Sequence, residues 1–199
     1  MNILFVCTGN TCRSPIAEAL LKSRNIDGLQ VRSAGIYASE GGPISRNSQL
    51  VLEQQMIPFA HSSTSVDETL IDWADLILTM TASHKHAIIL GFPHAISKIY
   101  MYKEFVTPDD IKDVSDPYGG DLFTYESTLA ILSSQSPLFV WKRLSIFEYF
   151  ESGLRFTKSA KSKIRALLEI SLSSTTATAY WIFPNPDISI PSLLNSKSL

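Results

Sequence analysis

The sequence predicts an α/β fold in which a parallel sheet is covered by helices on both faces. Short apolar runs of strand length alternate with segments in which apolar residues recur at helical spacing. The first apolar run, residues 3–6, leads through a short loop to a helix start near Pro15. Such strand–loop–helix units build parallel sheets that bind ligands at the carboxyl ends of their strands. We therefore expect three layers, α-β-α, with a central four-stranded parallel sheet.

The strands and helices are expected to alternate along the first two thirds of the chain. Residues 2–7 are nearly all apolar, which is typical of a strand buried on both faces. Ile16 and Leu20 stand four residues apart, as on one face of a helix. The expected strands are 2–7, 29–34, 74–80 and 97–101, and the expected helices are 15–24, 45–54, 83–90 and 121–133.

The loop after the first strand carries the strongest functional signal. It reads Cys7-Thr8-Gly9-Asn10-Thr11-Cys12-Arg13-Ser14-Pro15. Between Cys7 and Arg13 the chain is short enough to curl around a tetrahedral oxyanion, so that Thr8, Gly9, Asn10, Thr11 and Cys12 point backbone N–H groups inward. Gly9 is expected to lower the steric cost of the curl. Ser14 and Pro15 suit a helix cap and a first helical turn, so the loop should end at a helix N-terminus.

Cys7 and Arg13 then have the chemistry of a phosphoryl-transfer site. The helix N-terminus and the Arg13 guanidinium both favour a thiolate at Cys7, and Arg13 can hold two phosphate oxygens. The Ser14 hydroxyl is within reach to donate to that thiolate, and the Asn10 side chain could brace the loop. The alternative is a small buried cysteine at a strand end beside a solvated arginine. We favour a phosphate-ester or phosphoramidate active site.

A carboxylic acid is needed to protonate the leaving group. Asp116 is our choice, because Pro117 stiffens the chain after it, and Asp113 is the second choice. The alternative for Asp116 is a plain turn former. Tyr118 could line a pocket for a planar leaving group, and its ring would stack on a phenol or on a guanidinium.

The chain resembles the low-molecular-weight protein tyrosine phosphatase family. The resemblance covers roughly residues 1–130 and rests on residues 7–15, 33–35 (Ser-Ala-Gly), 74–80 and 116–118. Within the family it is most similar to the bacterial protein arginine phosphatases, whose loop has threonine where the tyrosine enzymes usually have an apolar residue; here this is Thr11. The resemblance implies a Rossmann-like low-molecular-weight phosphatase fold, a cysteinyl-phosphate intermediate, Asp116 as general acid, and no metal or organic cofactor.

Phosphoarginine on proteins is therefore the expected substrate, inorganic phosphate the product, and phosphotyrosine the close alternative. Many tyrosine-specific members have two successive aromatic residues where this chain has Tyr118-Gly119. Arsenate reduction on the same scaffold needs further cysteines, and the chain has only Cys7 and Cys12. A phosphoprotein-binding module would not need a nucleophile and an acid.

Two further motifs leave alternatives open. Cys12 is either a small side chain packed beneath the loop or, as the resemblance suggests, a partner that protects oxidised Cys7 through a disulfide. His84 and His86 form a His-x-His without a nearby cysteine or carboxylate at ligand spacing. We expect ordinary helix residues there and no metal site.

Composition excludes several classes of partner. The net charge is −2 and lysine and arginine form no long basic tract, so neither nucleic acid nor an acidic membrane surface is expected to bind. No secretory leader pattern and no apolar run of roughly 18 residues is found. We expect a cytoplasmic enzyme with reduced thiols.

The last third departs from the family pattern. We expect a phosphatase domain over residues 1–135 and an atypical C-terminal segment over 136–199, partly helical or disordered. Residues 133–137 (Ser-Ser-Gln-Ser-Pro) break a helix that the family would continue. The segment could pack on the domain, form a disordered tail, or derive from an altered reading frame and impair activity.

Overall fold

Four parallel strands form the centre of the protein. The computed structural model describes residues 1–106 and 113–134. Its strands are β1 (Asn2–Cys7), β2 (Gln30–Gly35), β3 (Leu76–Thr79) and β4 (Ile99–Met101), hydrogen-bonded in the order β2-β1-β3-β4. Every neighbouring pair is parallel. The predicted four-stranded parallel sheet is confirmed.

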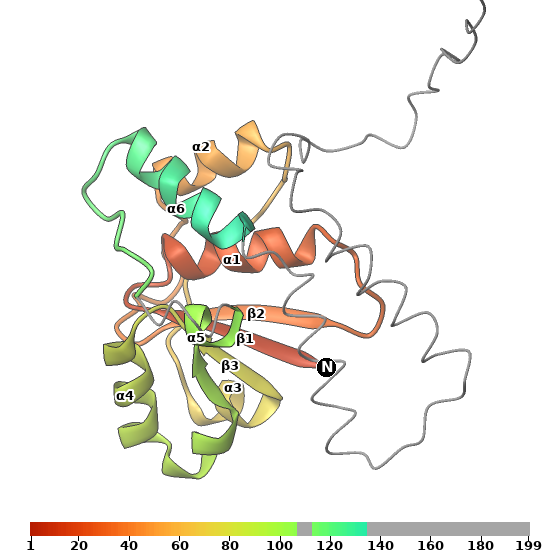
Figure 1. The fold of residues 1–199 in the computed structure, drawn as a ribbon, viewed down its shortest axis with the longest axis vertical. Helices are drawn as coiled ribbons and strands as arrows, with labels where there is room; N and C mark the ends of the chain where they lie inside the picture. Colours follow the sequence, from red (N-terminus) through yellow and green to blue (C-terminus); the bar gives the residue numbers. More distant parts are fainter. Residues whose placement is uncertain (107–112, 135–199) are drawn as a thin grey trace, which may run out of the picture. The chain divides into compact units, whose positions relative to one another are not determined.

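Helices cover both faces of this sheet, as expected (Figure 1). Alternate residues of β1 point to opposite faces: Ile3 and Phe5 belong to one core cluster, Leu4 and Val6 to the other. The first cluster is covered by α1 (Arg13–Lys22), α2 (Arg46–Gln54), α5 (Tyr102–Val106) and α6 (Leu122–Ser134). The second is covered by α3 (Glu68–Trp73), α4 (Ala82–Gly91) and the 3-10 helix η1 (Pro93–Lys98).

The differences from the predicted elements lie in short segments. The sequence did not predict α3, η1 or α5, which are too short for an apolar period to stand out. The start of α3 is fixed by Asp67, whose Oδ1 accepts a hydrogen bond of 2.7 Å from Leu70 N. Residues 97–98, predicted as strand, belong to η1, and Ala74 terminates α3 before β3 begins.

Gly35, the last residue of β2, sets how closely the Cys7 loop lies against the sheet. A Cβ atom at Gly35 would lie 2.7 Å from Thr8 O and 2.8 Å from Asn10 N, which is closer than packed atoms approach. Beyond Gly35 the chain continues along the loop, where Ile36 N donates to Cys7 O at 3.0 Å and Tyr37 N to Thr8 O at 2.8 Å. Only glycine allows this contact without moving backbone.

We expect Gly35→Ala to destabilise the protein by about 1–3 kcal/mol, because the new methyl group overpacks a backbone contact that cannot relax. Gly91→Ala is the matched control, since nothing lies within 4 Å of its Cβ position. This control should be neutral or slightly stabilising. Urea unfolding of both variants measures the effect, and wild-type stability of Gly35→Ala would contradict the account.

Candidate active site

In the loop between β1 and α1 the backbone carbonyl groups point outward, away from the centre of the loop. The carbonyl oxygens of Cys7, Thr8, Asn10 and Thr11 all accept hydrogen bonds from residues outside the loop. Their donors are Ile36 N, Tyr37 N, His61 Nε2 with Ser63 Oγ, and Ser45 N. Because a trans peptide points its N–H opposite to its carbonyl, the N–H groups that follow these carbonyls face the inside of the loop. This is the geometry of an anion-binding nest.

Asn10 supplies the sharp bend of the loop. It has a positive φ of 54° and is fully buried. Its Oδ1 accepts from Thr64 N at 2.9 Å, and its Nδ2 donates to Ser14 Oγ at 3.0 Å. The sequence assigned the steric freedom of the curl to Gly9, which is wrong in detail: Gly9 has no positive φ, and a Cβ there would make only an ordinary contact of 3.8 Å. The predicted bracing by the Asn10 side chain is present.

The helix cap also differs from the prediction. Cys12, and not Ser14, is the N-cap residue of α1, without a side-chain cap hydrogen bond, and Pro15 is the third helical residue. Ser14 does not cap because its hydroxyl contacts the side chains of the loop instead. The first N–H groups of α1 are therefore left to bind an anion.

Ser14 lies directly beside the predicted nucleophile. Its Oγ is 3.0 Å from Cys7 Sγ, and both side chains are buried. Ser14 Oγ accepts from Asn10 Nδ2, and its own hydrogen can go to Cys7 Sγ at 3.0 Å or to Ala34 O, which lies farther away at 3.4 Å. A hydrogen bond to sulfur stabilises the thiolate, which is the reactive form.

A buried polar chain extends from Ser14 that the sequence analysis missed. Asn10 Nδ2 also donates to Ser33 Oγ at 2.8 Å, and Ser33 Oγ donates to Glu18 Oε2 at 2.5 Å. Lys22 Nζ pairs with Glu18 Oε1 at 2.5 Å from one turn further along α1. A signal was available in the sequence, because Ser14, Glu18 and Lys22 stand four residues apart and so share one face of the predicted helix.

Arg13 is buried at the base of the loop, with 4 % of its side chain exposed. Its Nη1 donates to Val114 O at 3.2 Å, and its Nη2 donates to Thr8 Oγ1 at 3.3 Å and to Asp116 Oδ2 at 2.6 Å. Its Nε has no hydrogen-bond partner among the described residues. A buried guanidinium N–H without a partner is unfavourable, and an anion in the nest would satisfy it.

Asp116 meets Arg13 at the mouth of the loop, with 49 % of its side chain exposed. Its second oxygen, Oδ1, accepts from Tyr118 N at 3.2 Å. The second-choice acid, Asp113, instead accepts from Ala82 N at 2.8 Å at the start of α4. Tyr118 is 80 % exposed. The structure thus brings Asp116, and not Asp113, to the arginine of the loop.

Cys12 and Thr11 lie side by side on the α6 side of the loop. Thr11 Oγ1 is 3.5 Å from Cys12 Sγ, and Cys12 Sγ is 3.3 Å from the Tyr125 hydroxyl. Burial raises the pKa of Tyr125 to about 12, so its hydroxyl stays protonated and can donate to the sulfur. Cys12 is buried, as the packed alternative requires, and both cysteines are free thiols. A disulfide in the oxidised protein stays a prediction.

His84 is a further site residue that the sequence analysis treated as an ordinary helix residue. It is buried in the first turn of α4, with Nε2 at 2.9 Å from Thr8 Oγ1. Burial, reinforced by the charge of Arg13, lowers the pKa of His84 to about 4. His86 is exposed, so the two histidines do not face a common ligand.

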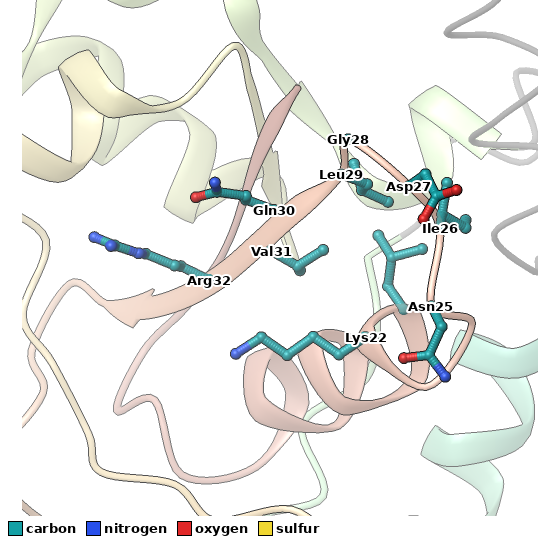
Figure 2. Close-up of a pocket in the computed structure, with 10 residues that line it drawn as sticks. Lys22, Asn25, Ile26, Asp27, Gly28, Leu29, Gln30, Val31 and Arg32 are labelled. Carbon is teal, nitrogen blue, oxygen red and sulfur yellow. The ribbon is translucent and has the colours of Figure 1, made fainter.

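One hollow in the described part of the chain lies away from this loop. It has a volume of about 540 Å³ and is lined by residues 21–22 and 25–32, at the end of α1 and the start of β2 (Figure 2). This is the amino end of the strands, so it contains none of the predicted site residues.

Among the helices of the described residues, none combines the length and the apolar character that a membrane span requires.

The family model of low molecular weight phosphotyrosine protein phosphatases matches residues 2–145. The chain belongs to this family. It is 45 % identical over 125 residues to a protein-arginine-phosphatase of Geobacillus stearothermophilus, covering 63 % of this chain and 84 % of the relative. It is 38 % identical over 128 residues to the low molecular weight protein-tyrosine-phosphatase PtpB of Staphylococcus haemolyticus, covering 64 % and 89 %.

A solved structure of this phosphatase family is also similar. It is the YwlE arginine phosphatase in which serine replaces the active-site cysteine and is phosphorylated, at a TM-score of 0.68 and 37 % identity. The match covers 78 % of this chain and 100 % of the other. The predicted fold and family are confirmed, and the chain is a protein phosphatase.

We expect Ser14→Ala to slow the alkylation of Cys7 by iodoacetamide at neutral pH by about tenfold, because a hydrogen bond to a charged sulfur is worth about 1.5 kcal/mol. Peptide mass spectrometry separates Cys7 from Cys12. Ser23→Ala is the control at the C-terminal end of α1, since the hydrogen bond of Ser23 Oγ within the described residues goes to the local carbonyl of Leu20. Equal Cys7 reactivity in both variants would remove the role of Ser14.

We expect acid to destabilise the wild type more than a His84→Gln variant. The folded-state pKa of about 4 lies below the unfolded value of 6.5, so the unfolded chain binds the proton more strongly in between. The free energy of unfolding is thus unaffected by His84 protonation above pH 6.5 and decreases as the pH falls towards 4. At pH 5 the wild type should have lost about 1–2 kcal/mol more of its free energy of unfolding than His84→Gln. Urea unfolding at pH 7.5 and pH 5 measures it, and parallel losses in both proteins would contradict it.

Proposed function

We propose that this protein removes the phosphoryl group from phosphoarginine residues of proteins through a cysteinyl-phosphate intermediate. The observation that carries the proposal is the convergence of Cys7, Arg13 and Asp116 on one inward-facing loop that contains Thr11. A nucleophile, an anion nest and an acid are the parts that phosphoryl transfer from a side chain requires.

In the first step the Cys7 thiolate attacks phosphorus. Loop N–H groups and Arg13 hold the three equatorial oxygens, while Ser14 supports the thiolate before attack. The P–N bond breaks as the S–P bond forms, and the leaving nitrogen takes a proton from Asp116. An anion in the nest takes the place of Asp116 at Arg13 Nη2, which frees the carboxyl group for this proton transfer.

In the second step water attacks the phosphorus of the cysteinyl-phosphate. Asp116, now a carboxylate, accepts the proton of the water, the S–P bond breaks, and inorganic phosphate leaves with the Cys7 thiolate restored. The oxidation state of phosphorus is the same in the substrate, the cysteinyl-phosphate and the released phosphate. The proposal requires neither a metal nor an organic cofactor, and the phosphorylated serine in the solved relative supports a covalent step at this position.

Two features favour arginine over tyrosine as the residue that is dephosphorylated. Thr11 offers a hydroxyl in the loop, where it can hydrogen-bond a polar leaving group. Gly119 has a φ of +78° in a turn that is closed by a hydrogen bond of 2.9 Å from Gly120 N to Pro117 O. This turn strains any residue other than glycine. Tyr118 is therefore left without a second aromatic neighbour to sandwich a phenol ring.

Phosphotyrosine is the alternative substrate, since Tyr118 can stack on either group and a tyrosine phosphatase is among the relatives. Arsenate reduction is less favoured, because the whole chain contains only two cysteines. A non-catalytic binding module is less favoured, because Cys7 and Asp116 would then serve no purpose.

Several expectations remain predictions. These are the direct phosphate and substrate contacts of residues 8–14 and 118, the release of inorganic phosphate, the absence of nucleic-acid and membrane partners, and a cytoplasmic location. The division into a catalytic domain, 1–135, and a C-terminal segment, 136–199, also stays a prediction. Residues 135–199, over which the segment was expected to be partly helical or disordered, lie outside the described residues.

The purified chain should hydrolyse a phosphoarginine peptide with a kcat/KM at least tenfold above that for the matching phosphotyrosine peptide. The selectivity follows from a polar Thr11 and a single exposed aromatic residue. Cys7→Ser provides the blank. A preference for phosphotyrosine would overturn the substrate, and no Cys7-dependent hydrolysis of either peptide would overturn the proposed function.

Replacing Thr11 by Ile removes the hydroxyl and keeps a β-branched side chain. The ratio of phosphoarginine to phosphotyrosine kcat/KM should fall by about tenfold, the size of one lost hydrogen bond. Thr64→Val is a control outside the loop, since the Thr64 hydroxyl bonds only Ser62 O. A wild-type ratio in Thr11→Ile would exclude Thr11 as the specificity residue.

Asp116→Asn should lower kcat by about 10²- to 10⁴-fold and change the affinity for inorganic phosphate far less, because the amide cannot supply the proton. Asp113→Asn is the matched control and should keep most of kcat. Steady-state kinetics with inorganic phosphate as a competitive inhibitor measures both. If the control loses kcat while Asp116→Asn keeps it, the two aspartates have been assigned in the wrong order.

A further inference from the structure

His84 connects α4 to the catalytic loop. The helix begins at Thr81, whose hydroxyl accepts from the His84 backbone N at 3.1 Å. This fixes the backbone from which the imidazole reaches Thr8 Oγ1 at 2.9 Å. Thr8 follows the nucleophile directly and also accepts from Arg13 Nη2 at 3.3 Å. None of the chemical steps proposed above uses the imidazole.

The Thr8 hydroxyl joins Arg13 to His84. A guanidinium only donates, so Thr8 Oγ1 is the acceptor for Arg13. The pKa of His84, lowered mainly by burial, keeps the ring neutral, so one of its two nitrogens carries a hydrogen. Thr8 Oγ1 donates to Nε2 in one tautomer and accepts from it in the other, because the hydroxyl has one hydrogen and a second lone pair. In both tautomers the Thr8 hydroxyl links the guanidinium to the imidazole.

This arrangement is unfavourable for folding. In the described part of the chain the second ring nitrogen, Nδ1, is buried without a hydrogen-bond partner. Leaving a buried polar atom unpaired is unfavourable, whereas an apolar side chain of similar size would not incur that penalty. The polar side chain is therefore not explained by packing, and its one side-chain hydrogen bond to a described residue leads to the Cys7 loop.

The contact matters most at the moment of proton transfer. Among the residues that the structure describes, three acceptors hold Arg13: Val114 O at Nη1, and Thr8 Oγ1 and Asp116 Oδ2 at Nη2. Asp116 must leave Nη2 to serve the leaving group. Thr8 and Val114 then remain to hold the plane of the guanidinium while it binds phosphate.

We propose that His84 is a positioning residue of the phosphatase: through the Thr8 hydroxyl it holds the Arg13 guanidinium in the plane that binds the transferring phosphoryl group. The inference rests on the proposed function for the phosphatase chemistry, but it does not depend on which phosphorylated side chain is the substrate. It assigns a catalytic consequence to a buried side chain on a helix outside the loop.

The test compares four full-length variants. His84→Leu removes the hydrogen bond and fills the space. His84→Gln can place an amide near the position of Nε2, whereas His84→Asn reaches only the position of Nδ1. His86→Leu is the control, because His86 is exposed on the same helix. Each variant is assayed for kcat, for KM, for inhibition by inorganic phosphate and for thermal unfolding.

His84→Leu and His84→Asn should each lower kcat/KM and the affinity for inorganic phosphate by about tenfold, the size of one hydrogen bond. His84→Gln should recover most of both, and His86→Leu should match the wild type. The melting temperature of His84→Leu should equal or exceed that of the wild type. Wild-type activity in His84→Leu, or equal losses in the Gln and Asn variants, would overturn the proposal.

A double-mutant cycle with Thr8→Val isolates the route. If His84 acts through the Thr8 hydroxyl, His84→Leu should have no further effect on phosphate inhibition in a Thr8→Val background. Fully additive losses would overturn the route through Thr8.

The proposed function and this inference can fail separately. If the wild type prefers phosphotyrosine, the same comparisons are made on that peptide. If it hydrolyses neither peptide, the proposed function fails, and calorimetric titration of inorganic phosphate still decides the role of His84. An unchanged phosphate dissociation constant in His84→Leu would then count against it.

Discussion

Four carbonyl groups of the Cys7 loop are held from outside, and the active site depends on this anchoring. With Cys7 O and Thr8 O fixed by the chain that leaves β2, and Asn10 O and Thr11 O by later segments, the loop cannot turn its carbonyls towards a bound anion. The close approach at Gly35 is the steric condition for the first two of these bonds. The anion nest is therefore formed before any ligand arrives, and little reorganisation is left for the reaction.

The polar groups behind the loop are buried and mutually satisfied. The chain from Glu18 through Ser33, Asn10 and Ser14 ends at Cys7 Sγ, and its far end is neutralised by Lys22. Such a network is unfavourable when one partner is missing but rigid when all are present. It fixes the side chains that face the nucleophile. Two atoms beside the loop are exceptions, because Arg13 Nε and His84 Nδ1 are buried without a partner among the described residues.

The sequence predicts the sheet, the longer helices and the three residues that we propose carry the chemistry. Cys7, Arg13 and the helix start lie within one segment of nine residues, so their relation is local, and Asp116 was chosen for its place before Pro117 and for the resemblance. The features that the sequence did not predict depend on contacts between distant segments. Gly35 lies 28 residues from Cys7, and Thr8 and His84 are 76 residues apart. The spacing of apolar residues along the sequence does not indicate which distant residues come into contact. The cap was misplaced because Ser14 has a tertiary partner that outweighs its local preference.

The most direct test of the account is to trap the intermediate. Wild-type protein mixed with excess phosphoarginine peptide should be quenched in denaturant within the first turnovers and digested for mass spectrometry. The account predicts one phosphoryl group on the sulfur of Cys7 and none on Cys12. Variants in which Ser or Ala replaces Cys7 should contain no S–P bond. Turnover that never yields phosphorylated Cys7, even when Asp116→Asn slows the reaction, would contradict it and would mean that water attacks the substrate directly.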